Sequence, residues 1–541
     1  MKKALALLTA VFLIMTSACG TVSAPPMTNA ATESQEITIE TDSPSIATEP
    51  TAQPDPFSQE DDFIESTNEI VIVLSELIEA QNAVHKAALD TQFTEEFIQA
   101  NGPDFYDTLD LVSEEEATAM LNSRQRELYE LCTKEDALQD MDLLFRVFKS
   151  FYGSYYFFGG DEAFDAAEEQ ILAELTECPD KFTLSDLVAI ISKNLYFIKD
   201  GHMNIGEELL CETNKIAWHN YYVKNLYFYE DDAGYYTKIQ GRKWYLEAVG
   251  TEEEIGSFLK ITIDENGQLC YMLCLATNVD DPRLTFKEIT LARGERKAII
   301  PILWTEFDRR SNYSYTETVS IRNGIPLIES KTVANRNFPP EETDMQQQRL
   351  REMGEDILSQ DVVVLNLVSG CGWQSMFESI DHLICSIDLF RLSNTADYLD
   401  RWMMPWEDAA IGQYAVRYNP GLWGKNDTLV FAVQDLYNFS AGSSTIADIR
   451  AIENIILVGG ITGGTAGPSS ATNQVMVLPN TGLVVAFGAT LFIAPGYAEE
   501  GHCFEPDIWV NPTDAVDAIY RLCDYYGIRN TADLSVLDQY Q

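Results

Sequence analysis

The sequence predicts a mixed α/β protein, because three different patterns of apolar and polar residues follow one another along the chain. Residues 63–200 carry apolar side chains at helical spacing, and residues 206–330 alternate aromatic and β-branched residues with polar ones. Beyond about residue 344, continuous apolar runs alternate with helical patterns, which is typical of a sheet with crossover helices.

The chain has 541 residues, more than a single compact core accommodates, so we divide it into segments. The predicted segments are a lipoprotein signal peptide over 1–19, an acidic Ser/Thr/Pro linker over 20–62, a helical region over 63–200, a β-rich segment over 201–343, an α/β core over 344–530 and a tail over 531–541. The linker holds few large apolar residues and is expected to be a disordered tether.

The first residues have the features of an export signal. Lys2 and Lys3 precede the apolar run Ala4–Met15, which is too short to span a bilayer. The small residues before Cys19 resemble the lipobox of bacterial lipoproteins, in which this Cys carries the lipid, although Thr16 stands where Leu is usual. We expect lipidation at Cys19 and a place on the outer face of a bacterial cell membrane. An ordinary signal peptide would give a secreted protein instead.

Charge and cysteine spacing exclude several classes of function. The chain has 85 acidic and 36 basic residues, a formal net charge of −49, whereas nucleic-acid binding needs clustered Lys and Arg. The cysteines are scattered without a CxxC pair, so neither a zinc site nor a disulfide framework is indicated. Cys270 and Cys274 are predicted to be buried apolar residues. We expect no metal and no cofactor.

Several elements can be predicted from short stretches. "DVVVLNLV", "TLVFAVQD" and "NIILVGG" are apolar runs typical of strands buried on both faces. "QVMVLPNTGLVVAFG" predicts a hairpin that turns between Pro479 and Gly482, and "NPTDAVDAIYRLCDYYG" predicts a closing helix. In the helical region, Thr183 and Ser185 are candidate helix caps.

The stretch "QDLYNFSAGSSTIADI" places Ser440 between a strand pattern and a helical pattern. Unpaired backbone N–H groups at a helix start favour a developing oxyanion, so this position suits a nucleophile. Ser is also a preferred N-cap, and Ser443, Ser444 and Thr445 compete for that role. From the residues alone, Ser440 is either a nucleophile or a helix cap.

A serine nucleophile needs a base, and the chain has five His. His85 and His382 lie in helical patterns and are predicted to be surface or packing residues. His202 follows Asp200 and a glycine at the end of a helical pattern. His502 comes after Ser440 in the chain, which is the order that an α/β-hydrolase esterase uses. Both His202 and His502 therefore remain candidate bases.

Six segments in chain order resemble the tail-specific, or C-terminal-processing, serine peptidase family. They are "KDGHMNI", "DVVVLNLVSGCGWQSM", "LYNFSAGS", "NIILVGGITGGTAGP", "LPNTGLVVAFG" and "EEGHCFEPDIWV". No single motif is specific, but six in the expected order are. The resemblance implies an α/β core of the ClpP/crotonase-like type and a serine-type peptidase that acts on peptides or unfolded proteins.

The resemblance also implies the site residues. Ser440 is the implied nucleophile, and backbone N–H groups of Gly370, Gly372 and Ala441 are the implied oxyanion hole. One branch of the family uses a Lys base at the position of Ile461, and no Lys follows Ser440 in this chain.

A second branch of the family, which includes nisin-resistance-type proteins, uses the His of the Asp-Gly-His segment. That residue is His202 here, and Asp200 is a possible orienting acid for its imidazole. The expected chemistry is acyl transfer to water through a Ser440–His202 dyad.

The motifs depart from the family pattern at three places. Val368 replaces the Arg of the glycine-rich turn, Ser443 replaces the Glu of the nucleophile segment, and the turn carries a bulky Trp373. Two alternatives therefore stay open. One is an inactive peptide-binding lipoprotein on the same fold, and the other is a Ser/His esterase that uses His502. The sequence does not indicate an oligomeric state.

Overall fold

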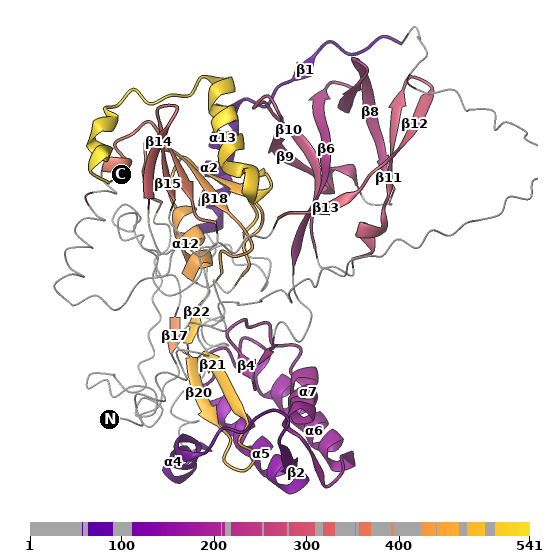
Figure 1. Cartoon of the computed structure of the whole chain (residues 1–541). Helices are drawn as coiled ribbons and strands as arrows, with labels where there is room; N and C mark the ends of the chain where they lie inside the picture. Colours follow the sequence, from indigo (N-terminus) through magenta and orange to yellow (C-terminus); the bar gives the residue numbers. More distant parts are fainter. Residues whose placement is uncertain are drawn as a thin grey trace, which may run out of the picture.

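The computed structural model has several helices and several sheets, which confirms the predicted mixed α/β class (Figure 1). The described residues are 57, 63–89, 111–206, 208–210, 218–250, 254–277, 281–308, 318–329, 352, 356–368, 391–393, 423–439, 441–464, 473–488, 490–492 and 504–540. The signal peptide with Cys19 lies outside them, as does the linker except for Phe57. Among the described helices, none is both long and apolar enough to cross a membrane.

Side-chain caps start three helices of the helical region. Ser113 and Thr183 each form a reciprocal capping box, and Thr133 accepts a hydrogen bond from a backbone N–H of the first turn. The predicted cap at Thr183 is thus confirmed. The elements here are α4 (Glu114–Asn122), β2 (Leu131–Thr133), α5 (Lys134–Phe151), α6 (Gly160–Glu177), β3 (Lys181–Thr183) and α7 (Leu184–Asn194).

These helices share their apolar core with a hairpin from much later in the chain (Figure 1). β20 (Asn473–Val477) and β21 (Val484–Gly488) pair antiparallel, which confirms the predicted hairpin. Phe487 is buried in the same cluster as the helices. β21 also pairs with β4 (Asn204–Ile205), the short strand that begins two residues after His202, and a further strand, β5 (Glu208–Leu209), pairs with β4.

Residues 219–306 of the predicted β-rich segment form, together with β1, one nine-stranded sheet, in which β1 and β13 pair with the two ends of the long β6. The described strands on either side of this range, within the predicted 201–343, belong to other sheets. Cys270 and Cys274 are buried in β10, as predicted. The strands are β1 (Glu69–Ile70), β6 (His219–Asp231), β7 (Gly234–Ile239), β8 (Arg242–Val249), β9 (Leu259–Ile263), β10 (Leu269–Thr277), β11 (Glu288–Arg293), β12 (Arg296–Pro301) and β13 (Trp304–Glu306). Two short 3-10 helices, η2 (Ile255–Ser257) and η3 (Pro282–Thr285), connect them.

The α/β core is a six-stranded sheet in the order β14-β15-β16-β18-β19-β23, parallel from β15 onward. The three predicted buried strands are β16, β18 and β19. The strands are β14 (Thr318–Arg322), β15 (Ile325–Glu329), β16 (Val362–Asn366), β18 (Leu429–Gln434), β19 (Ile455–Gly459) and β23 (Ile508–Trp509). A separate pair, β17 (Arg391–Ser393) and β22 (Thr490–Phe492), is antiparallel.

Helices cover both faces of this sheet, because its strands are apolar on both sides. Val363 of β16 packs with α12 (Ala441–Ile449) on one face. Val364 packs with α13 (Pro512–Tyr526), the predicted closing helix, on the other face. The chain ends in the 3-10 helix η4 (Leu534–Tyr540).

The helices of the range 63–200, predicted as one helical region, belong to two different apolar cores in the structure. α2 (Leu74–Leu89) packs against the α/β sheet with α13 and belongs to that core. His85 of α2 lies 3.1 Å from the Asp507 carboxylate, and Asn82 hydrogen-bonds Asn454. Helical spacing predicts an apolar face but carries no information about which partner covers it.

Asp140 of α5 fixes the tip of the β20–β21 hairpin to the helices. This buried carboxylate accepts hydrogen bonds from the backbone N–H groups of Asn480 (3.2 Å) and Thr481 (2.7 Å). It also accepts from the Asn480 side-chain amide (2.8 Å) and the Thr481 hydroxyl (2.6 Å). Burial raises the pKa of the Asp140 carboxyl above its ordinary value, and these hydrogen bonds oppose the shift.

We predict that Asp140→Ala lowers the free energy of unfolding by about 3 kcal/mol, because buried donors on the hairpin lose their acceptor. The control is Asp142→Ala on the same helix, whose side chain is 70% exposed in an ion pair with Arg146. It should cost less than about 1 kcal/mol. Urea unfolding measures both. Equal losses in the two variants would contradict the role assigned to Asp140.

Candidate functional site

The predicted nucleophile segment connects a buried strand to a helix. β18 ends at Gln434 and α12 begins at Ala441, so the strand and helix predicted on either side of Ser440 are confirmed. Ser440 itself lies outside the described residues. Its neighbour Phe439 forms a β-bridge with Gly464, which lies in the loop after β19.

Asn438 fixes the loop before Ser440 in place. Its side-chain amide donates to the Leu367 carbonyl just after β16 (2.7 Å), and its side-chain oxygen accepts the Asp435 N–H (2.7 Å). Its backbone oxygen accepts the Gly463 N–H at 3.0 Å. This buried residue therefore joins the loop to segments on both sides. Sequence reasoning missed Asn438, because a polar loop residue carries no signal of its partners.

Ser443, the residue at the position of the Glu in the motif that the segment resembles, makes a hydrogen bond within the site. It is fully buried, and its hydroxyl donates to the Asn438 carbonyl at 2.7 Å. The bond closes the first turn of α12 onto the loop that precedes it. A Ser at this position thus supports the local conformation of the nucleophile segment.

Of the three residues implied to form the oxyanion hole, the structure describes Ala441. Gly370 and Gly372 are outside the described residues, which reach Val368 on this side. Ala441 is the first residue of α12, where backbone N–H groups lack intrahelical acceptors. The N–H of Leu367 donates to Val433 at 3.0 Å, so the chain leaves β16 still paired with β18.

Asp200 holds the loop that carries His202. Its Oδ1 accepts the His202 backbone N–H (2.8 Å), and its Oδ2 accepts the Tyr152 hydroxyl (2.8 Å). Oδ1 lies 3.9 Å from Nδ1 of His202, which is longer than a hydrogen bond. Asp200 is fully buried. In this geometry, Asp200 positions the loop backbone and places a carboxylate near the imidazole.

The His202 ring lies beside the nucleophile segment. Its centroid is 6.3 Å from that of Phe439, the residue immediately before Ser440. The His202 side chain is 11% exposed. The structure thus brings together the Asp-Gly-His segment and the Ser440 segment, although the distance from Ser440 to His202 stays a prediction.

Ile461, at the position where the resemblance implies a Lys in one branch of the family, occupies an apolar environment. Its side chain is fully buried where the α/β core meets the β-rich sheet. Its backbone N–H donates to the Asn220 side chain at 3.2 Å. The buried side chains of this cluster, besides Ile461, are Tyr222, Met272, Cys274, Phe307 and Trp509. The Ile461 side chain therefore packs in the interface between the two sheets.

The other described His are engaged with carboxylates. His85, predicted to be a surface or packing residue, is buried against Asp507. His219 lies 2.7 Å from Glu306 at the paired ends of β6 and β13. His382 and the rival base His502 lie outside the described residues.

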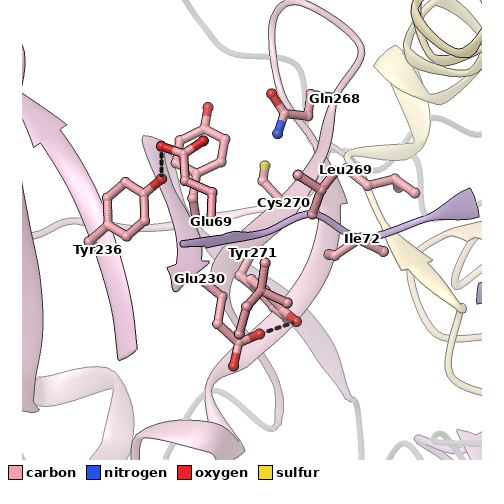
Figure 2. Close-up of a pocket in the computed structure, with 11 residues that line it drawn as sticks. Glu69, Ile72, Glu230, Tyr236, Gln268, Leu269, Cys270 and Tyr271 are labelled. Carbon is pink, nitrogen blue, oxygen red and sulfur yellow. Dashed lines mark hydrogen bonds between the residues drawn. The ribbon is translucent and has the colours of Figure 1, made fainter. Parts of the chain in front are cut away.

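Within the part of the chain that the structure describes, no group of three or more His, Cys, Asp or Glu side chains could hold a metal ion. A pocket lies elsewhere, between β1 and β10 of the β-rich sheet (Figure 2). There Tyr236 donates to Glu69 (2.9 Å) and Tyr271 donates to Glu230 (3.0 Å). None of the candidate catalytic residues lines this pocket.

Comparisons with known proteins give structural similarity alone. No family model matches the chain, and no curated protein matches it. The mature CPAF structure aligns with a TM-score of 0.36 and 10% identity over 73% of this chain and 95% of that one. The photosystem II D1 C-terminal processing protease aligns with a TM-score of 0.31 and 13% identity, over 72% of this chain and 96% of that one. A lipoprotein from Streptococcus agalactiae aligns with a TM-score of 0.28 and 10% identity, over 74% of this chain and 99% of that one. Similarities at this level do not assign an activity.

We predict that Asn438→Ala lowers the free energy of unfolding by about 2 kcal/mol, because the Leu367 carbonyl and the Asp435 N–H lose their partner. Asn438→Asp is the sharper variant, since it keeps the acceptor for Asp435 and removes the donor to Leu367. It should be no more stable than the Ala variant. Thermal unfolding compares the three proteins, and wild-type stability in Asn438→Asp would show that the bond to Leu367 contributes nothing.

Proposed function

We propose that this chain is an exported, membrane-anchored serine peptidase that uses Ser440 as nucleophile and His202 as general base. One observation carries the proposal: the His202 ring lies 6.3 Å from the ring of Phe439, which directly precedes Ser440. The ordered motifs that resemble tail-specific peptidases point to the same pair. The buried, apolar position of Ile461 leaves the Lys base of the other branch without a counterpart.

The proposed reaction has two acyl-transfer steps. His202 takes the Ser440 hydroxyl proton while Oγ attacks the scissile carbonyl carbon, and the C–N bond breaks as His202 returns the proton to the leaving amine. Water then attacks the acyl-enzyme ester with His202 again as base. The products are two peptides and the regenerated serine.

Backbone donors are proposed to stabilise the oxyanion. Ala441 is the first residue of α12, where N–H groups lack intrahelical acceptors and the helix dipole favours negative charge. Gly370 and Gly372 would supply donors from the turn after β16. The Asn438–Leu367 hydrogen bond supports this arrangement, because it joins the loop before Ser440 to the segment that leads into that turn. Each such donor lowers the barrier by about 3–4 kcal/mol.

The proposed substrates are peptides or unfolded proteins. Lipidation at Cys19 would hold the catalytic part outside the membrane at the end of the acidic linker. The formal net charge of −49 suits a protein that stays in solution beside an anionic membrane surface.

We predict that Ser440→Ala and His202→Ala each reduce cleavage of an unstructured peptide by about four orders of magnitude with thermal stability retained, because both groups take part in every turnover. His219→Ala is the matched control, since this His also pairs with a carboxylate but lies on the β-rich sheet. It should keep most of the activity. Peptide cleavage and labelling of Ser440 by a fluorophosphonate measure the effects.

Two results would redirect the assignment. Full activity in His202→Ala with loss in His502→Ala would support the esterase order of residues. Absence of fluorophosphonate labelling in folded wild-type protein would support a peptide-binding protein without catalysis.

A further inference from the structure

Tyr152 connects the rigid helical core to the loop that carries His202. It directly follows α5, is fully buried, and its backbone N–H donates to the Phe148 carbonyl at 3.0 Å. Its hydroxyl donates to Oδ2 of Asp200 at 2.8 Å, between two fully buried groups. The remaining carboxylate oxygen accepts the His202 N–H. A single carboxylate thus joins the core on one side to the candidate base on the other.

Aromatic packing fixes the Tyr152 ring on several sides. It stacks on Phe158 with a 6.3 Å centroid distance and a 3° interplanar angle, and it meets Phe487 edge-on at 5.9 Å. Phe148 and Phe164 lie within 6.4 Å. The hydroxyl therefore has a fixed position, because aromatic packing holds the ring that bears it.

We propose that Tyr152 is a positioning residue for His202, and this inference rests on the proposed function. Its hydroxyl fixes the Asp200 carboxylate, and that carboxylate fixes the His202 backbone and faces Nδ1 at 3.9 Å. When His202 takes the Ser440 proton, the imidazolium gains a nearby fixed negative charge. Without the tyrosine bond, the carboxylate would lose the donor to Oδ2 and keep the bond from the His202 N–H to Oδ1, so its orientation would be less restricted.

The chain offers a matched control in Tyr155. It is also buried, lies three residues further along, and donates to a carboxylate, Oδ1 of Asp161 at 3.1 Å. Burial raises the pKa of the Tyr155 phenol, so its hydroxyl stays a donor. Asp161 lies in the first turn of α6 and is paired with Lys149, and its hydrogen bonds do not lead to His202.

The test compares Tyr152→Phe with Tyr155→Phe, since each removes one hydroxyl and keeps the ring. Tyr152→Phe should lower kcat about tenfold with KM nearly unchanged, a part of the roughly hundred- to ten-thousand-fold that a positioned general base contributes. Tyr155→Phe should leave both parameters unchanged. Retained kcat in Tyr152→Phe, or an equal loss in both variants, would overturn the proposal.

A second readout does not depend on catalysis. Hydrogen exchange of residues 200–205, measured in the Ser440→Ala background, reports the hydrogen bond between the His202 N–H and Asp200. Exchange should rise in Tyr152→Phe and stay unchanged in Tyr155→Phe, whereas unchanged exchange in both would overturn the positioning role. If wild-type protein shows no Ser440-dependent turnover, the proposed function fails, and this measurement alone decides the role of Tyr152.

Discussion

The arrangement of the candidate site depends on the parallel pairing of β16, β18 and β19. Because these strands run the same way, their carboxyl ends meet at one edge, and the segments leading to Gly370, to Ser440 and to Ile461 start there side by side. Asn438 then joins these segments through Leu367 and Gly463. An open α/β sheet places reactive groups at this edge because loops there can converge without breaking the strand pairing.

His202, the candidate base, comes from a part of the chain outside this sheet. His202 lies just beyond the helical region, which shares its core with the β20–β21 hairpin inserted between β19 and β23 of the sheet. β4, which begins two residues after His202, pairs with β21 of that hairpin. Strand pairing thus fixes a residue from the first half of the chain beside a loop from the second half. Asp140 supports this junction by binding the turn of the hairpin.

The fold class, the three buried strands and the hairpin could be predicted, because apolar runs and turn residues signal local structure directly. The contact between His202 and Phe439 could be anticipated only through the family resemblance, since spacing along the chain does not reveal tertiary contacts. Tyr152 and Asn438 could not be found at all, because their importance lies in hydrogen bonds to residues distant in the sequence. His85 shows the same limit: a helical pattern did not indicate its buried contact with Asp507.

The most direct test of the account is a crystal structure of the protein after reaction with a fluorophosphonate. The account predicts a covalent bond to Ser440 Oγ, with Nε2 of His202 about 2.6–3.2 Å from that oxygen or from the phosphonyl group attached to it. It also predicts the phosphonyl oxygen within hydrogen-bond distance of the Ala441 N–H. A structure in which His502, rather than His202, meets Ser440, or in which Ser440 stays unmodified, would contradict it.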